Sequence, residues 1–201
     1  LETLGGEDVG ALLALRPHLL LHRLLHARGR VDRLELDTVH ADAPLARGLV
    51  EHATQLAAAG IPFVFDPGQQ LPRFDGAELR SFVGQASWVA VNDYEGKMLC
   101  DRTGWSSAEI SRHVKGLIVT LGAEGSEVWV DGEKTLVPPV KATAVVDPTG
   151  CGDAYRSALL FGLEQGWPLA RCAALGSQLG ALKIAQRGPQ NYTIDLKSVG
   201  L

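Results

Sequence analysis

The 201-residue sequence has few cysteines and no targeting pattern. It contains three cysteines, an odd number, and no pair of them has C-x-x-C spacing. This count disfavours a disulfide framework and a zinc site, and it fits a reducing cytoplasm. No signal-peptide pattern stands at the start, which agrees with a cytoplasmic location.

Long apolar runs and concentrated positive charge are also missing. No apolar stretch approaches the roughly 20 residues that a membrane-spanning helix needs. The formal net charge is -4, and no run of basic residues offsets it. Because nucleic-acid binding needs a basic patch, we expect neither nucleic acid nor membrane as a partner.

Several catalytic signatures are absent as well. The P-loop pattern G-x-x-x-x-G-K-[ST] does not occur, which excludes a P-loop kinase. The glycine-rich stretch at 150–155 is not a Rossmann fingerprint, because its acidic residue falls inside the loop. There is no G-x-S-x-G nucleophile elbow and no H-E-x-x-H pair.

From residue 44 onward, helix-like and strand-like segments alternate. The expected helices are 44–60, 77–86, 92–101, 106–114, 154–166 and 168–186. The expected strands are 61–65, 87–91 and 116–120, with 126–130 and 133–137 as a hairpin around Asp131-Gly132, and 66–76 is expected to be a loop. The alternation predicts an α/β sandwich with a mainly parallel sheet, helices on both faces and one antiparallel hairpin.

Residues 11–40 differ from this pattern, since they are rich in Leu, Arg and His. His18, His22 and His26 are spaced at i, i+4 and i+8, so they share one face of any helix there. Two histidines at this spacing can bind one metal ion, but no third type of ligand stands at a recognisable spacing. We therefore prefer a solvated polar face to a metal site.

The stretch D-P-T-G-C-G-D-A-Y, residues 147–155, places glycine on both sides of a cysteine just before a helix. The backbone N–H groups of Gly150, Cys151 and Gly152 are candidates to bind an oxyanion, helped by the helix dipole. Asp153 follows in the first turn. It is either a carboxylate that stabilises the helix dipole or a general base that accepts a proton from a hydroxyl group.

Two further sites follow predicted strands. Asn92 and Glu95 share one helix face and would hold the water shell of Mg²⁺, or they form a helix cap with an exposed Glu. The turn at 120–125 contains Gly122 and Gly125, and it is either an ordinary hairpin turn or a place that admits triphosphate oxygens.

Small residues recur along the expected last helix, namely Ala173, Ala174, Gly176, Gly180 and Ala181. They favour close packing against the sheet. The alternative is that the C-terminal end of this helix lines a cofactor pocket.

Taken together, the three sites resemble the ribokinase/pfkB family of small-molecule kinases. The family's D-T-x-G-A-G-D signature is matched by Asp147, Thr149, Gly150, Gly152 and Asp153. Its N-x-x-E motif is matched by Asn92 and Glu95, and its T-x-G-x-x-G turn by Thr120, Gly122 and Gly125. Cys151 replaces the usual alanine, which matters little for a loop that acts through backbone N–H groups. Within the family, residues 44–192 look most like bacterial adenosine kinase-like nucleoside kinases.

The resemblance implies ATP-dependent phosphorylation of a nucleoside 5′-hydroxyl. The anion hole would be formed by Gly150, Cys151 and Gly152, and Asp153 would be the base. Mg²⁺ is implied at Asn92 and Glu95 through water, and a monovalent cation such as K⁺ is a further candidate cofactor. Nucleotide contacts are implied for Thr120, Gly122, Gly125, Asp147 and Thr149, and more weakly for Gly188 and Asn191.

Two parts of the family pattern are missing, the Gly-Gly-Asn substrate motif and a β-sheet lid between residues 10 and 40. We therefore expect 1–201 to be one partial ribokinase-like domain, with 1–43 atypical and a working protein of about 300 residues. The partner is expected to be a small molecule, and the protein a monomer or homodimer. A sugar kinase of the same family and a truncated, non-catalytic nucleotide-binding remnant stay open as alternatives.

Overall fold

A computed structural model describes residues 44–195 and 197–200. The chain forms two compact units, one described over 44–138 and the other over 139–195 and 197–200. We call them the sheet unit and the helix-pair unit. The segment 1–43, which includes His18, His22, His26 and the expected lid, lies outside the described residues. That the whole chain is one domain stays a prediction.

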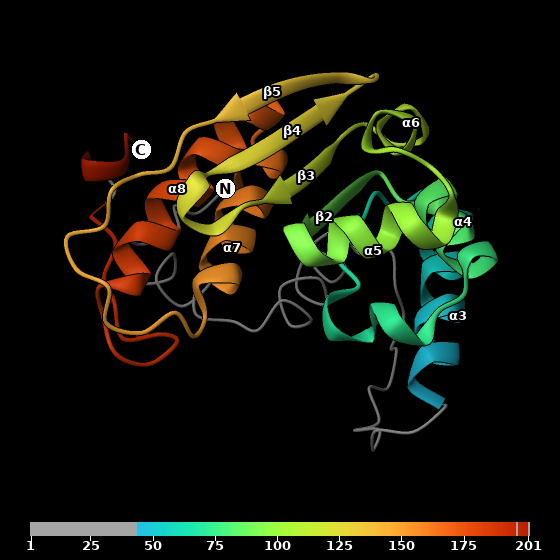
Figure 1. Cartoon of the computed structure of the whole chain (residues 1–201), viewed down its shortest axis with the longest axis horizontal. Coiled ribbons are helices and arrows are strands. Elements are labelled where there is room, and N and C mark those ends of the chain that lie inside the picture. The colour runs from blue at the N-terminus through green and yellow to red at the C-terminus, as the bar shows by residue number, and fades with distance from the viewer. Residues whose placement is uncertain (1–43, 196, 201) are drawn as a thin grey trace, which may run out of the picture. The chain divides into compact units, whose positions relative to one another are not determined.

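The sheet unit is built on five strands in the order β1-β2-β3-β4-β5 (Figure 1). They are β1 (Val64–Phe65), β2 (Trp88–Asn92), β3 (Leu117–Thr120), β4 (Ser126–Val130) and β5 (Glu133–Val137). The first three strands are parallel, and β4 and β5 add an antiparallel hairpin to β3. This mostly parallel sheet with one hairpin confirms the predicted fold class.

Helices alternate with the strands of this unit, as the sequence predicts. They are α3 (Pro44–Ala58), α4 (Gly76–Gln85), α5 (Asp93–Thr103) and α6 (Ser107–His113). The expected loop at 66–76 contains a 3-10 helix, η1 (Gly68–Arg73), and a second one, η2 (Gly122–Glu124), follows β3. The strand expected over 61–65 is only two residues long. The first two residues of this segment cannot donate to a neighbouring strand, because Ile61 N–H donates to Leu56 O at the end of α3 and Pro62 has no N–H.

Three helices of the sheet unit begin with a capping box, in which a polar side chain and a glutamate three residues later bond each other's backbone N–H. The pairs are Asp75 with Glu78, Asn92 with Glu95, and Ser106 with Glu109. Each box therefore fixes where a helix begins relative to the segment before it.

The core of the sheet unit follows from the apolar runs. Leu117, Ile118 and Val119 are buried in succession, as expected of an inner strand. The rings of Phe65 and Phe82 stack at 4.6 Å between centroids.

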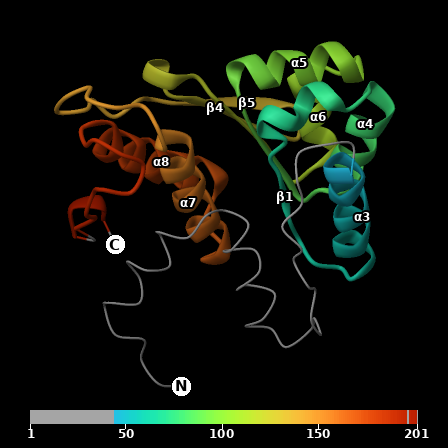
Figure 2. The same cartoon turned by 90° about the horizontal axis from the view of Figure 1, so that it is seen from below.

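The helix-pair unit contains α7 (Cys151–Glu164), α8 (Leu169–Ile184) and a short 3-10 helix, η3 (Lys197–Val199). Helices α7 and α8 lie side by side in both views (Figures 1 and 2). A Cβ atom added at Gly176 would lie 2.8 Å from the Tyr155 ring, and one added at Gly162 would lie 2.6 Å from Cys172 Sγ. These small residues thus allow close packing between two helices, whereas the sequence favoured packing against a sheet. Among the described residues, no helix is long and apolar enough to cross a membrane.

Candidate functional site

The start of α7 carries unpaired backbone donors. Gly150 precedes the helix in the left-handed region, with φ of 84°, and no side chain of the described residues caps the helix. The N–H groups of Gly150, Gly152 and Asp153 donate to no atom of the described residues. Because α7 is 14 residues long, its dipole adds partial positive charge at this end. The loop is therefore a candidate site for an anion such as a phosphate group.

The backbone N–H of Cys151 was expected to help bind the anion, but it makes a hydrogen bond within the loop. Its N–H donates to Pro148 O at 3.1 Å and closes a turn, so it is already engaged. The donors without an acceptor among the described residues are those of Gly150, Gly152 and Asp153, whereas Gly150, Cys151 and Gly152 were expected. Burial raises the pKa of the Cys151 thiol, which keeps it protonated at neutral pH.

Asp153 lies in the first turn of α7 with 61% of its side chain exposed. Its Oδ1 is 3.5 Å from Nη1 of Arg156, one helical turn later. The same Nη1 would lie 2.8 Å from a Cβ atom added at Gly152, so the guanidinium lies close to the backbone of the loop. Arg156 thus brings positive charge to the anion site. Sequence reasoning missed it, although its i+3 spacing from Asp153 was a usable signal.

Asp147 connects the loop to a segment 41 residues later in the chain. Its Oδ2 accepts a hydrogen bond from Gly188 N at 2.8 Å, and its Oδ1 accepts one from Thr149 N at 2.9 Å. The bond from Gly188, followed by those from Thr149, lowers the pKa of Asp147 to about 2. Asp147 therefore shapes the loop as a carboxylate at every physiological pH.

The segment after α8 packs closely on the same loop. A Cβ atom added at Gly150 would lie 2.8 Å from Pro189 Cβ, so only glycine fits at position 150. Asn191 Nδ2 donates to Arg187 O at 3.0 Å. Asn191 also borders a pocket of about 380 Å³ whose other lining residues are Leu182, Gln186, Gln190, Tyr192 and Thr193. The end of α8 therefore borders a pocket, and that this pocket holds a cofactor stays a prediction.

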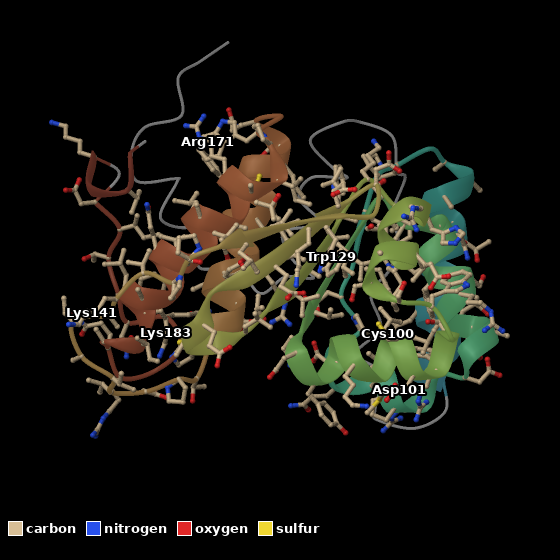
Figure 3. The ribbon with its side chains drawn as sticks, turned by 45° about the horizontal axis from the view of Figure 1, so that its top comes forward. Cys100, Asp101, Trp129, Lys141, Arg171 and Lys183 are labelled. Atoms are coloured by element: carbon tan, nitrogen blue, oxygen red, sulfur yellow. The ribbon has the colours of Figure 1, made fainter. Side chains whose placement is uncertain are left out.

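Lys183 is a second residue that the sequence reading missed. Its side chain is fully buried near the end of α8, and Figure 3 labels this residue. Its Nζ donates to Asp147 O at 2.6 Å and to Gln186 O at 3.2 Å. The sequence signal was weak, because a lysine late in a helix is ordinarily exposed. Asp147 and Lys183 together hold the loop in place.

In the sheet unit, Asn92 and Glu95 lie where β2 ends and α5 begins. Asn92 Oδ1 accepts a hydrogen bond from Glu95 N at 2.8 Å, and Glu95 Oε2 accepts one from Asn92 N at 2.9 Å. The capping interpretation is thus confirmed, but Glu95 is only 8% exposed rather than an exposed glutamate. Asn92 is paired in the parallel register with Thr120, so these residues meet at the carboxyl edge of the sheet.

The donor set at this edge allows one kind of magnesium site. Among the described residues, no group of three His, Cys, Asp or Glu side chains could hold a metal ion. Asn92 Oδ1 is occupied by the capping bond, whereas Glu95 Oε1 accepts no hydrogen bond from the described residues. These residues therefore do not form a closed cage, but they fit a magnesium ion held mainly by water and phosphate.

The glycine turn after Thr120 is folded as η2. Gly122 and Gly125 have φ of 60° and 94°, which only glycine adopts readily. Leu121 N–H donates to Gly125 O at 2.8 Å and closes the turn before β4. The structure thus groups Asn92, Glu95 and the turn in the sheet unit. It groups Asp147, Thr149, Gly150–Asp153, Gly188 and Asn191 in the helix-pair unit.

Comparisons with known proteins identify the family to which the chain belongs. A model of the family described as pfkB family carbohydrate kinase matches residues 14–195. The structure of Burkholderia thailandensis nucleoside kinase in complex with inosine superposes with a TM-score of 0.73 and 49% sequence identity. That match covers 76% of this chain and 50% of the other, and the complex of the same enzyme with ADP-inosine gives the same identity and TM-score, with 48% of that chain covered.

Two curated relatives extend the comparison. The nucleoside kinase of Methanocaldococcus jannaschii is 30% identical over 126 residues, which are 63% of this chain and 42% of the relative. The ribokinase of Lactococcus lactis is 30% identical over 158 residues, which are 74% of this chain and 50% of the relative. The chain thus spans half or less of the length of these relatives.

Proposed function

Since the chain belongs to the pfkB family of carbohydrate kinases, we propose that it transfers a phosphoryl group from ATP to the 5′-hydroxyl of a purine nucleoside. The observation that carries this proposal is the start of α7, where three N–H groups that donate to no described residue lie within one turn of the Asp153 carboxylate. Phosphoryl transfer to an alcohol needs hydrogen-bond donors for the phosphoryl oxygens beside a carboxylate that acts as the base.

In the proposed reaction, the Asp153 carboxylate accepts the proton of the attacking hydroxyl. The hydroxyl oxygen forms a bond to the γ-phosphorus, and the bond from that phosphorus to the bridging oxygen breaks to release ADP. The N–H groups of Gly150, Gly152 and Asp153 donate hydrogen bonds to the phosphoryl oxygens as negative charge develops on them. Catalysis then comes mainly from positioning and charge stabilisation.

Magnesium, when bound with ATP, would neutralise charge on the phosphate oxygens and help to fix their position. Glu95 is the residue we propose to hold it, with its free Oε1 accepting a hydrogen bond from a metal-bound water. Asn92 positions Glu95 through the capping box and does not contact the ion.

The purine preference rests on similarity. The Burkholderia thailandensis nucleoside kinase, 49% identical over the matched region, has been solved with inosine and with ADP-inosine. We therefore propose inosine, guanosine and adenosine as acceptors and ATP as the donor. The Lactococcus lactis ribokinase, whose match covers 74% of this chain, supports a sugar acceptor as the second candidate.

A coupled assay of ADP formation tests these acceptors directly. The protein would be given Mg²⁺-ATP with inosine, guanosine, adenosine, ribose or fructose. We expect turnover with at least one purine nucleoside and less with either sugar, whereas a preference for ribose or fructose favours the second candidate. Binding of ATP without turnover on any acceptor would instead identify a non-catalytic nucleotide-binding remnant.

A further inference from the structure

We propose that the ammonium group of Lys183 permanently fills a monovalent-cation position beneath the 147–153 loop, so that the chain needs no K⁺ there. Its importance for catalysis rests on the kinase function proposed above. The position itself rests only on the geometry of the helix-pair unit.

The ligands of this ammonium group are main-chain oxygens. Lys183 Nζ donates to Asp147 O at 2.6 Å and to Gln186 O at 3.2 Å, and none of the side chain is exposed. Among the described residues, no carboxylate forms an ion pair with Lys183. A buried charge bound by neutral carbonyl oxygens resembles the way in which proteins replace the hydration shell of K⁺.

A lysine near the end of a helix would ordinarily extend its ammonium group into water. Burying the charge is costly unless the surroundings compensate for it. Here α8 ends at Ile184, one residue after Lys183, so the negative end of the helix dipole lies close by. The Asp147 carboxylate also gains from the charge, since Lys183 is among the causes that lower its pKa.

The carbonyl groups leave little for a separate ion to bind. Ile184 O already accepts hydrogen bonds from Val146 N at 2.8 Å and Asp147 N at 3.1 Å. The oxygens of Asp147 and Gln186 are bound by the ammonium group. The residues present therefore do not fit K⁺ as an additional cofactor at this position, although the family resemblance suggested one.

The consequence is a fixed positive charge behind the anion loop. Lys183 bonds the backbone of Asp147, the residue whose carboxylate holds Thr149 N and Gly188 N. A site for free K⁺ would be occupied to a degree that depends on the K⁺ concentration, whereas a tethered ammonium group is always present. The loop should therefore be equally ordered in the presence and absence of K⁺.

Two variants test this assignment by thermal unfolding. Lys183→Ala removes the charge and opens space for an ion, and Lys183→Met removes the charge but fills most of the space. Both would be melted in KCl, LiCl and choline chloride at equal ionic strength. In choline we expect both melting temperatures to fall by about 5–10 °C, because two hydrogen bonds to a charged donor are lost. KCl should recover about half of this loss for Lys183→Ala and none for Lys183→Met, and the parent protein should respond equally to all three salts.

Several outcomes would overturn the assignment. One is a parent protein whose melting temperature is higher in KCl than in choline chloride. The others are a Lys183→Ala variant whose melting temperature shows no selective gain in KCl, and a Lys183→Ala variant that stays unfolded with K⁺ present. If Lys183 were merely structural, its replacement would lower the melting temperature in every salt, and K⁺ would not selectively restore it. If the melting results hold and no acceptor is phosphorylated, the proposed function fails while the cation position stands. If turnover occurs but requires K⁺, the cation position fails while the proposed function stands.

Discussion

The site residues of the sheet unit are held by neighbours in the chain, whereas those of the helix-pair unit are held by distant segments. Asn92 and Glu95 bond each other across three residues at the start of α5. Asp147 bonds Gly188 across 41 residues, and Lys183 reaches back to Asp147 across 36. The two sites should therefore differ in how easily the substitution of one residue disturbs their geometry.

A local capping box tolerates conservative change, because either Glu or Gln at its third position can bond the backbone. Asp147, Lys183 and Gly188 form a tertiary clamp on the 147–153 loop. This clamp tolerates less change, since each of its residues is matched to a particular partner and to the space around it. We therefore expect substitutions near the 147–153 loop to have larger effects than equivalent ones at the start of α5.

The largest effect should come from Asp153, which lies in the clamped region. Asp153→Asn removes the proposed base but keeps the size of the side chain, so turnover should fall about 10²- to 10⁴-fold while ADP binding is retained. Steady-state kinetics and calorimetric titration with ADP measure the two quantities. The matched control is Asp101→Asn in the sheet unit, where the exposed carboxylate pairs with Lys97 and turnover should not change. A near-parental kcat for Asp153→Asn would show that Asp153 is not the base.

Gly150→Ala should give the next largest effect. Alanine at φ of 84° is strained, and its Cβ would overlap Pro189, so the free energy of unfolding should fall by about 2–4 kcal/mol. Urea denaturation measures this loss. Gly180→Ala is the control, because no atom lies within 4 Å of the new Cβ and the helix interior favours alanine. It should raise stability by about 0.5–1 kcal/mol, and an equal loss in both variants would contradict the clamp.

Glu95→Gln separates capping from metal binding in the sheet unit. Glutamine can keep the capping bond but holds a metal-bound water less well, so the Mg²⁺ concentration for half-maximal turnover should rise about 3- to 10-fold. Stability should stay within about 0.5 kcal/mol of the parent. Glu109→Gln changes the equivalent position of another capping box and should leave the Mg²⁺ titration unmoved. Identical titrations for both variants would reduce Glu95 to a helix cap.

The smallest effect is not a loss at neutral pH but a change with pH, and it concerns Asp147. Its pKa in the folded chain is about 2, below the value of about 3.9 expected when unfolded, so the carboxylate stabilises the fold above about pH 4. This contribution is lost as the pH falls through about 2. The difference in melting temperature between the parent and Asp147→Asn should therefore be constant from neutral pH to about pH 5 and shrink below it. A difference that stays constant down to pH 2 would show that the charge of Asp147 is not needed.

The features that the sequence predicted are those set by near neighbours. The turn at Asp131-Gly132 and the cap at Asn92 depend on residue types within a few positions, and the structure contains them. The strand at 61–65 was predicted too long, because the hydrogen bond from Ile61 to α3 is not visible in a local apolar run.

The candidate site was predictable only in part for the same reason. Glycines before a helix indicated the anion loop. The bond from Cys151 N–H to Pro148 O is a local turn, yet it was not predicted. Lys183 could not be identified, since its burial depends on a carbonyl group 36 residues away. Arg156 was overlooked because a charged residue on a helix is ordinarily solvent-exposed.

The three capping boxes also bear on the order in which the chain folds. Their bonds span only three residues, so α4, α5 and α6 can begin to form before distant parts of the chain meet. The bonds from Lys183 and Gly188 to Asp147 close loops of 36 and 41 residues and need α8 to be in place. Substitutions in the boxes should therefore slow refolding, whereas substitutions at Asp147 or Lys183 should mainly speed unfolding. The anion loop would then be the last part to become ordered and the first to be lost.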